Sequence, residues 1–212
     1  MKTLIFQNKT FLLYFILILF HTVGIVGLSN PSYHAYFLSL SFFNLLLSFT
    51  VLLLGRNHHT SKFYLFIFIC AFYGMSVEWV GVHTHLLFGN YNYGKNLGYK
   101  IFDVPLIIGI NWCVLTIATS SIASKITNST YLHLLISCSL MVVIDLLIEP
   151  VAIKSDYWTW YQGEIPLYNY ICWFVISIPI HFLYLKLKLS EQNNVAVCLY
   201  VVLFVFFSLL NL

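Results

Sequence analysis

Seven long apolar stretches, separated by short polar segments, constrain this chain more than any other feature of its sequence. Each has about the 20 mostly apolar residues that a helix needs to span a bilayer. The composition agrees, because 60% of the 212 residues are hydrophobic and only 8% are charged, far from the balance of a soluble domain. We therefore predict an all-α polytopic membrane helix bundle with about seven transmembrane helices, forming one integral membrane domain over residues 1–212. The predicted spans are residues 11–28, 33–54, 63–87, 104–123, 131–150, 167–187 and 195–212.

The first stretch follows Lys2 and Lys9 and has some features of a signal peptide. Its apolar run is long and no small-residue cleavage site follows it, so a retained helix is the favoured interpretation. The cysteines fall inside predicted spans at no metal-like spacing, which favours packing over disulfide or ligand roles. They are Cys70, Cys113, Cys138, Cys172 and Cys198.

Basic residues predict the orientation of the bundle. Helix alternation places more of them on the side of the N-terminus, and basic residues favour the inner side of a membrane, so we expect the N-terminus inside and the C-terminus outside. No clustered basic and aromatic surface indicates a nucleic-acid partner. The expected inner residues are Lys2, Lys9, Arg56, Lys62, Lys125, Lys186 and Lys188, against Lys95, Lys100 and Lys154 outside.

Acidic residues within the apolar segments are the strongest functional signal. Glu78, Asp145 and Glu149 lie inside or at the ends of predicted spans, where an ionised side chain costs roughly 3 kcal/mol at a helix centre. Alternating helix directions bring the three to one end of the bundle, whichever way the bundle is oriented. The adjoining loops add three further acids at that end: Asp103, Asp156 and Glu164. We predict that this is the working end.

Glu78, Gly81 and His85 fall on one helical face, so a carboxyl and an imidazole are expected two turns apart. Gly81 permits close approach of another segment along that stripe. His83 is expected to point away from His85, which makes the His-x-His pair a poor helical metal site, and no metal or cofactor is predicted. Alternatively, these histidines only form hydrogen bonds at the membrane interface.

Asp145 and Glu149 are neighbours at the i, i+4 spacing on one helical face. Two close carboxylates in a low dielectric cannot both ionise comfortably, so one is expected to hold its proton and serve as a general acid. The structural alternative has Glu149 solvated at the helix end and Asp145 paired with a buried Asn or His. Pro150 favours a helix end at that point, although its ring could instead kink a continuing helix.

Aromatic residues concentrate at the same end of the predicted bundle. Many of them fit the aromatic belt that forms at membrane interfaces. The others could line a pocket in which ring faces stabilise a carbocation, and an acid beside such a cage suits protonation of an isoprenoid double bond. The residues are Trp79, Trp112, Trp158, Trp160, Trp173, Tyr91, Tyr93, Tyr157, Tyr161 and Tyr168.

An ordered set of motifs runs through the middle of the chain. It comprises Glu78 with Gly81, Phe88-Gly89-Asn90-Tyr91-Asn92-Tyr93, Val104-Pro105, Trp112, Asp145-x-x-x-Glu149-Pro-Val-Ala, Tyr157-Trp-x-Trp, Ile165-Pro-Leu-x-Asn169 and Trp173-Phe174. Over about residues 65–185 the chain resembles the carotenoid biosynthesis family of the CruF and bisanhydrobacterioruberin hydratase type. Glu149 stands where an Asp would be equally expected.

The resemblance implies cofactor-independent addition of water across the terminal 1,2 double bond of an acyclic carotenoid end group. It also implies a bacterial or archaeal inner (cell) membrane, a hydrophobic carotenoid substrate, and other carotenoid enzymes as partners. In this scheme Asp145 or Glu78 gives the proton, and Glu149 or His85 orients or deprotonates the water. The expected substrate-binding residues are Trp79, Trp112, Trp158, Trp160, Tyr93 and Asn169.

Two other functions fit the same residues. A membrane carotenoid cyclase or isomerase also protonates a polyene, but a neighbouring double bond captures the cation. A non-enzymatic proton-coupled transporter or lipid-binding membrane protein would use the acids as a relay or to seal helix interfaces, although seven spans suggest no inverted pair of three-helix halves. Isoprenoid chain transfer is disfavoured, because no double-aspartate motif and no glycine-rich phosphate loop is present.

Overall fold

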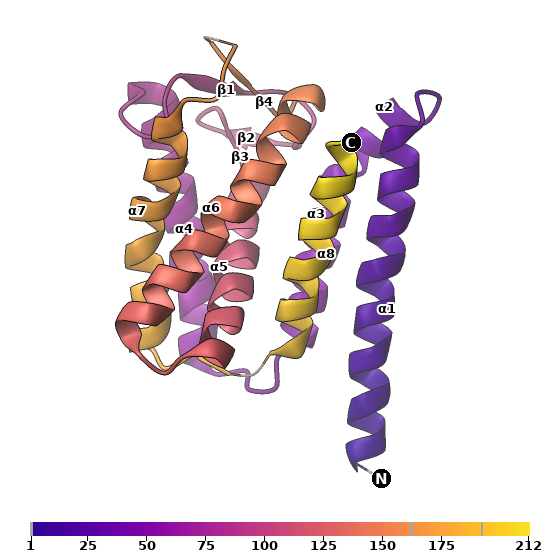
Figure 1. Ribbon diagram of the computed structural model, residues 1–212, viewed down its shortest axis with the longest axis vertical. Coiled ribbons are helices and arrows are strands. Elements are labelled where there is room, and N and C mark those ends of the chain that lie inside the picture. The colour runs from indigo at the N-terminus through magenta and orange to yellow at the C-terminus, as the bar shows by residue number, and fades with distance from the viewer. Residues whose placement is uncertain (1, 162, 192) are drawn as a thin grey trace.

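The computed structural model describes residues 2–161, 163–191 and 193–212, with side chains from residue 8 onward, and it is built mainly of helices that run alternately up and down (Figure 1). The helices are α1 (Lys2–Ser29), α2 (His34–Ser39), α3 (Ser41–Leu54), α4 (Ser61–Thr84), α5 (Ile107–Ile126), α6 (Thr130–Lys154), α7 (Leu167–Lys186) and α8 (Asn194–Leu210). The strands are β1 (Tyr91–Tyr93), β2 (Lys100–Ile101), β3 (Val104–Pro105) and β4 (Trp158–Trp160). The strands all lie at the end of the bundle opposite the N-terminus (Figure 1).

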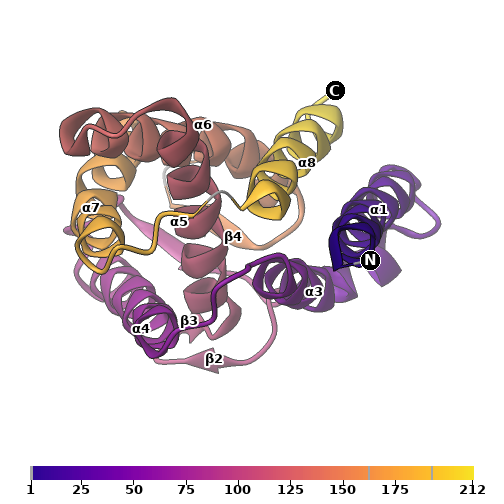
Figure 2. The ribbon, with the colours of Figure 1, turned by 90° about the horizontal axis from the view of Figure 1, so that it is seen from below.

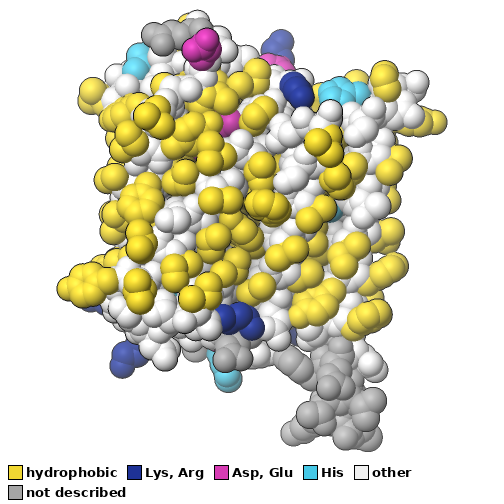
Figure 3. Space-filling model, in the orientation of Figure 1, with side chains coloured by type: hydrophobic (Ala, Val, Ile, Leu, Met, Phe, Trp, Pro, Cys, Tyr) yellow, Lys and Arg dark blue, Asp and Glu magenta, His cyan; other side chains and the backbone are white. Residues whose placement is uncertain are grey.

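The all-α class is confirmed, and the protein is a membrane protein by the length and composition of its helices. Five helices, α1, α4, α5, α6 and α7, are long and apolar enough to cross a bilayer, whereas α3 and α8 are apolar but shorter, with 14 and 17 residues. Each predicted stretch contains a helix, but the second is divided at Leu40 into α2 and α3. Hydrophobic side chains cover the middle of the face in Figure 3, and charged ones gather towards its ends. The count of seven crossings and the orientation stay predictions.

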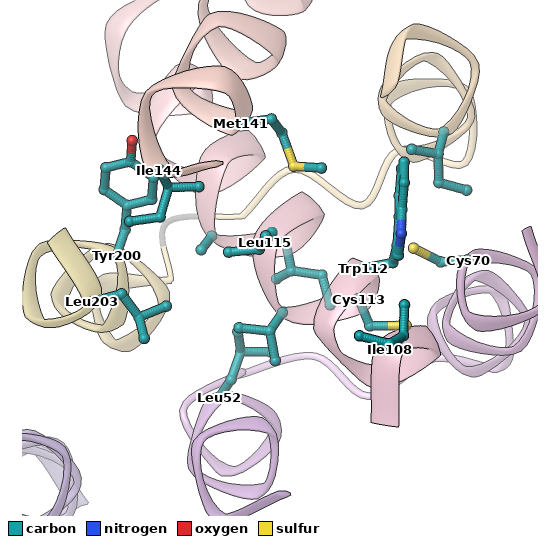
Figure 4. Close-up of a cluster of buried hydrophobic side chains, with 14 of the residues drawn as sticks. Leu52, Cys70, Ile108, Trp112, Cys113, Leu115, Met141, Ile144, Tyr200 and Leu203 are labelled. Atoms are coloured by element: carbon teal, nitrogen blue, oxygen red, sulfur yellow. The ribbon is translucent and has the colours of Figure 1, made fainter. Parts of the chain in front are cut away.

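The central helix of the bundle is α5, around which α3, α4, α6, α7 and α8 are arranged (Figure 2). In the most apolar 18-residue segment of α5, 78% of the residues are buried, against 22% in that of α1, which lies at the edge of the bundle. Small side chains on α5, among them Gly109 and Ala118, let neighbouring backbones approach closely. In Figure 4 the α5 side chains lie among Leu52 of α3, Met141 of α6 and Leu203 of α8. This core fixes the positions of the helices that carry the acids.

The fifth predicted span, residues 131–150, corresponds to α6. The prediction that this helix ends at Pro150 is wrong, because α6 continues to Lys154. Proline lacks a backbone N–H and therefore removes one helical hydrogen bond without forcing the helix to stop. Glu149 consequently lies inside the helix and is 2% exposed. The structural alternative required Glu149 to be solvated at a helix end, and this part of it is wrong.

Both ends of α4 are set by local interactions. The Thr60 side chain accepts a hydrogen bond from the Phe63 N–H and caps the first turn. At the other end, His85 adopts a left-handed conformation with φ of 56° and its N–H donates to the Gly81 carbonyl. The helix therefore stops at Thr84, which directs His85 away from the face it would occupy if the helix continued.

The acidic residues divide between the two ends of the bundle as the helix alternation predicted. Glu78, Asp145 and Glu149 all lie near the end that carries the strands. Glu191 lies at the opposite end, where its carboxylate is 3.6 Å from the guanidinium of Arg56.

Candidate active site

An antiparallel pairing of β1 with β4 brings four aromatic side chains over the acidic end of the bundle. Tyr91 lies opposite Trp160, and Tyr93 lies opposite Trp158. Because alternate residues of a strand share a face, these four rings point to the same side of the ladder. Tyr91 and Trp160 have ring centroids 5.2 Å apart, and Tyr93 and Trp158 have theirs 6.0 Å apart. The ladder is thus an aromatic cap with its polar atoms directed towards the acids.

Glu78, on α4, accepts three hydrogen bonds under this cap. The Tyr91 and Tyr93 hydroxyls donate to Oε2 at 2.5 and 2.8 Å, and Trp112 Nε1 of α5 donates to Oε1 at 3.1 Å. Burial, together with the neighbouring Glu78 carboxyl, raises the pKa of Tyr91 and of Tyr93 well above the ordinary value of 10.0. Both phenols therefore keep their protons and act as donors.

Two glycines on α4 make this arrangement possible. A Cβ at Gly74 would lie 2.4 Å from the Trp112 ring, and a Cβ at Gly81 would lie 2.7 Å from the Tyr91 hydroxyl. Gly74 stands four residues before Glu78 and Gly81 three residues after it, so both face the same side of the helix. The sequence predicted close approach at Gly81, and the segment that approaches is β1.

Asp145 and Glu149 of α6 share one donor from α7. Asn169 Nδ2 lies 2.8 Å from Asp145 Oδ2 and 3.2 Å from Glu149 Oε1. Glu149 Oε2 also accepts hydrogen bonds from Trp158 Nε1 and Trp160 Nε1, both at 2.9 Å. Asn169 is the donor to Asp145 among the described residues, so Asp145 has one hydrogen-bond donor whereas Glu149 has three.

Further aromatic rings line the inner side of the acids. Trp112 and Trp173 are stacked, with centroids 4.8 Å apart and an interplanar angle of 16°. Phe88 lies against Trp173 at 5.6 Å. Indole and phenyl faces are electron-rich, so this wall can stabilise a positive charge.

The three acids line one small cavity of about 30 Å³, which exceeds the roughly 10–15 Å³ that a cavity needs to hold a water molecule. A much larger apolar cavity of about 620 Å³ adjoins it, and Ile108, Asn111 and Trp158 line both. The small cavity is lined by Glu78, Phe88, Tyr91, Tyr93, Ile108, Asn111, Asp145, Glu149, Trp158, Trp160, Asn169 and Trp173. We call the small cavity the acid cavity and the large one the chain cavity.

The acid cavity gathers three carboxyl groups, and among the described residues no basic side chain forms an ion pair with them. Among the described residues, the contacts between basic and acidic groups are Arg56 with Glu191 and His83 with Asp103, and neither involves a cavity acid. The cavity is therefore complementary to a neutral ligand that develops positive charge, since fixed carboxylates and ring faces both favour a cation.

A comparison with known proteins identifies the family of the chain. The sequence profile of a family described as "Carotenoid biosynthesis protein" matches residues 34–212. The chain belongs to this family. The match is wider than the resemblance over residues 65–185, and it includes every residue of the acid cavity. Helix α1 lies outside the matched range.

One curated relative is a bisanhydrobacterioruberin hydratase from Haloarcula japonica. The two sequences are 26% identical over 114 residues, which covers 48% of this chain and 37% of the relative. The chain thus matches little more than a third of the relative's length. No solved structure matches the chain.

Most of the predicted catalytic and substrate-binding residues of this carotenoid biosynthesis family member lie at or next to the acid cavity. Glu78, Asp145 and Glu149 line it together. Five of the six predicted substrate-binding residues donate a hydrogen bond to one of these acids: Tyr93, Trp112, Trp158, Trp160 and Asn169. The pairing of Asp145 with a buried Asn is also what the structural alternative predicted. The catalytic roles of these residues stay predictions.

Two predicted site residues lie elsewhere. His85 is exposed, and it does not line the acid cavity, because α4 ends one residue before it. Trp79 is 44% exposed and its ring lies 5.2 Å from that of His83, on the outer side of α4. The predicted alignment of His85 with Glu78 is therefore wrong, and Trp79 fits the interfacial belt.

Several cavity residues were absent from the set predicted as site residues. Tyr91 makes the shortest hydrogen bond to Glu78, and Asn111 lies where the two cavities meet. The alternation in Tyr91-Asn92-Tyr93 and in Trp158-Thr159-Trp160 was a usable signal for Tyr91, because period-two aromatics predict a strand with one aromatic face. Asn111 has no such signal, since it is a single polar residue in an apolar helix.

Proposed function

We propose that this protein is a carotenoid hydratase that adds water across the terminal 1,2 double bond of an acyclic carotenoid end group. The observation that carries the proposal is the acid cavity: three carboxyl groups and several aromatic side chains line a space that can hold a water molecule, next to a large apolar cavity. Membership of the carotenoid biosynthesis family and the similarity to a protein named a hydratase support it.

Asp145 is the proton donor in this proposal. Glu78 and Glu149 each accept three hydrogen bonds, which stabilises their ionised forms. Among the described residues Asp145 has the single donor Asn169, and it is 2% exposed, so it is the acid with the least support for a negative charge. Proton transfer from its carboxyl to C2 of the end group leaves a tertiary cation at C1.

The cation at C1 is stabilised by its surroundings. In this proposal Glu78 and Glu149 are ionised and supply negative charge, and the ring of Trp173, which stacks on Trp112, supplies an electron-rich face. Such preorganised groups act strongly where water is excluded, because they need no reorganisation as the charge develops. The hydrogen bonds of Glu78 to Tyr91, Tyr93 and Trp112 hold it in place during this step.

Water captures the cation and the proton balance closes within the cavity. The oxygen of the water forms a bond to C1, and Glu149 accepts the proton that the water loses. That proton then returns from Glu149 to Asp145, which restores both groups; they are one helical turn apart and share Asn169 as donor. The net change is addition of one water and formation of a tertiary alcohol.

A membrane carotenoid cyclase is the alternative that uses the same acid and aromatic rings. The small cavity favours hydration, because it has space for about one water beside the acids. Incubation in water enriched in ¹⁸O separates the two, since only hydration places the label in the product. Product that lacks the label, or a product with a new ring, contradicts the proposal.

Single substitutions of the acids test the assignment of roles. Glu78→Gln, Asp145→Asn and Glu149→Gln should each lower the yield of hydroxylated pigment in cells that supply an acyclic carotenoid. Asp145→Asn should have the largest effect, because general acid catalysis contributes about 100- to 10,000-fold. Unchanged yield from all three variants, with normal amounts of protein in the membrane, contradicts the scheme.

A further inference from the structure

The chain cavity extends away from the acids between two groups of helices. Its walls come from α1, α2 and α3 on one side and from α5, α6 and α8 on the other. Its volume of about 620 Å³ lies within the range of roughly 300–1,000 Å³ that small-molecule pockets have. Most lining side chains are apolar, such as Leu47, Leu115 and Leu203.

The wall of the chain cavity reaches the surface of the protein at α1, α2 and α3. Four of its lining side chains are among the exposed hydrophobic residues of the protein: Phe20 at 49%, Val23 at 46%, Tyr36 at 63% and Phe43 at 61%. In an apolar helix bundle, exposed side chains of this kind face lipid tails. A hydrophobic molecule dissolved in the bilayer can therefore enter without crossing water.

The inner end of the cavity identifies its occupant. Ile108, Asn111 and Trp158 line both cavities, so a molecule lying in the chain cavity presents its terminus to the acids. A phospholipid acyl chain has no group at its terminus that the acids could act on. An acyclic isoprenoid chain ends in a trisubstituted double bond, which a general acid can protonate.

We infer that the chain cavity binds the isoprenoid chain of the substrate, which enters from the bilayer between α1 and α3. We also infer that α1 selects which isoprenoid chains are bound, by their length. The selection follows from position: α1 lies outside the range matched by the family profile, yet Phe20, His21, Val23, Gly24 and Leu28 form one wall of the cavity. The reacting end is thus held by residues within the matched range, whereas the isoprenoid chain also contacts a wall, on α1, that lies outside it. The inference rests on the proposed function for the identity of the reacting end.

Two positions on α1 allow the cavity to be narrowed. A Cβ at Gly24 would lie 3.1 Å from Cε2 of Phe206, at the end of a side chain that can move, so Gly24→Leu should be accommodated by filling the cavity. Val23→Phe adds volume where α1 lines the cavity. Val26→Phe is the matched control, because Val26 is on the same helix, is 66% exposed and does not line the cavity.

Binding is measured on the full chain in lipid nanodiscs, in an Asp145→Asn background that prevents conversion. Quenching of tryptophan fluorescence reports the binding of lycopene, an acyclic 40-carbon polyene, and competition against lycopene reports geranylgeraniol, a 20-carbon isoprenoid. Gly24→Leu and Val23→Phe should weaken lycopene binding about tenfold or more, while geranylgeraniol binding changes less than about threefold, because a shorter chain needs less of the cavity. Val26→Phe should bind lycopene as the Asp145→Asn parent does.

The outcomes separate this inference from the proposed function. Lycopene binding that is equal in Gly24→Leu, Val23→Phe and Val26→Phe overturns the inference, as does a parent that does not bind lycopene. If Gly24→Leu does not fold, judged by its melting temperature, Val23→Phe decides the result. Selective loss of lycopene binding supports the inference even if the protein with Asp145 intact forms no hydroxylated product, in which case the proposed hydration alone fails.

Discussion

The acid cavity and the chain cavity meet at Asn111 and Trp158 but differ in size and in the polarity of their linings. The acid cavity is about 30 Å³ in volume, and each of its carboxyl groups has a named hydrogen-bond donor. The chain cavity is about twenty times larger, at about 620 Å³, and most of its lining is apolar. The first is defined by directional contacts and the second by shape and volume.

The difference has an energetic basis. Unfilled apolar space is unfavourable, because the side chains that line it have no contacts on that side, and the chain cavity is large, at about 620 Å³. An apolar occupant, lipid or substrate, therefore belongs in the chain cavity. The acid cavity is small enough for its cost to be offset by its hydrogen bonds. Changes in the acid cavity should lower the rate of reaction, and changes in the chain cavity should lower binding.

The largest expected effect comes from Asp145→Asn. The amide keeps the size of the side chain but has no acidic proton to give, so we expect the turnover number to fall about 100- to 10,000-fold. Binding of lycopene should change less than about threefold, because the chain cavity is untouched. Turnover is measured by chromatography of pigment extracts and binding by fluorescence quenching.

Asp156→Asn is the matched control for that prediction. Asp156 lies at the same end of the protein, but it is exposed and does not line the acid cavity. Asn tolerates the positive φ of 50° at this position, so this variant should retain normal turnover. Equal losses in the two variants would show that the effect arises from charge at this end of the protein and not from the acid cavity.

A smaller loss is expected from Trp160→Phe. The phenyl ring keeps the aromatic cap but lacks the Nε1–H that lies 2.9 Å from Glu149 Oε2. A hydrogen bond to a charged group contributes about 1.5–3 kcal/mol, so turnover should fall by about 10- to 150-fold. Trp79→Phe, at a ring on the outer side of α4, should leave turnover unchanged, and a comparable loss there would assign the effect to the interfacial belt.

Gly74→Ala tests how the helix core supports the acid cavity. The added Cβ would lie 2.4 Å from the Trp112 ring, which must move away from α4. Overpacking of this kind costs about 1–3 kcal/mol, so the melting temperature in detergent should fall and turnover should fall with it. Ser76→Ala, two residues further along the same helix, should leave both unchanged. A stable and fully active Gly74→Ala would show that Trp112 does not need its present position.

The parts of the fold that the sequence predicted correctly depend on simple periodicities. Apolar length was sufficient to locate the helices, and helix alternation was sufficient to bring Glu78, Asp145 and Glu149 to one end. The break at Leu40 and the continuation of α6 through Pro150 are not marked by these periodicities, and we infer that packing against other helices decides them. A local pattern carries no information about such tertiary contacts.

The candidate site was predicted least well where the chain leaves its helices. The assignment of a shared face to Glu78 and His85 assumed that the helix continued, whereas His85 turns into a left-handed conformation one residue after it ends. The partners of Glu78 come instead from Tyr91 and Trp112, and their approach depends on glycines at positions 74 and 81. Pairing between β1 and β4 joins residues almost 70 positions apart, which a single sequence does not reveal.

The smallest expected effect is that of His85→Ala, and it sharpens the boundary of the acid cavity. His85 is exposed and does not line that cavity, so its loss should change turnover by less than about twofold, in contrast to the effect of about 100-fold or more for a residue that transfers a proton. The measurement is the yield of hydroxylated pigment at equal protein level, with Asp145→Asn as the positive control. A loss of tenfold or more at His85 would mean that the loop after α4 folds over the acids during the reaction, and that the water is activated from outside the cavity and not by Glu149.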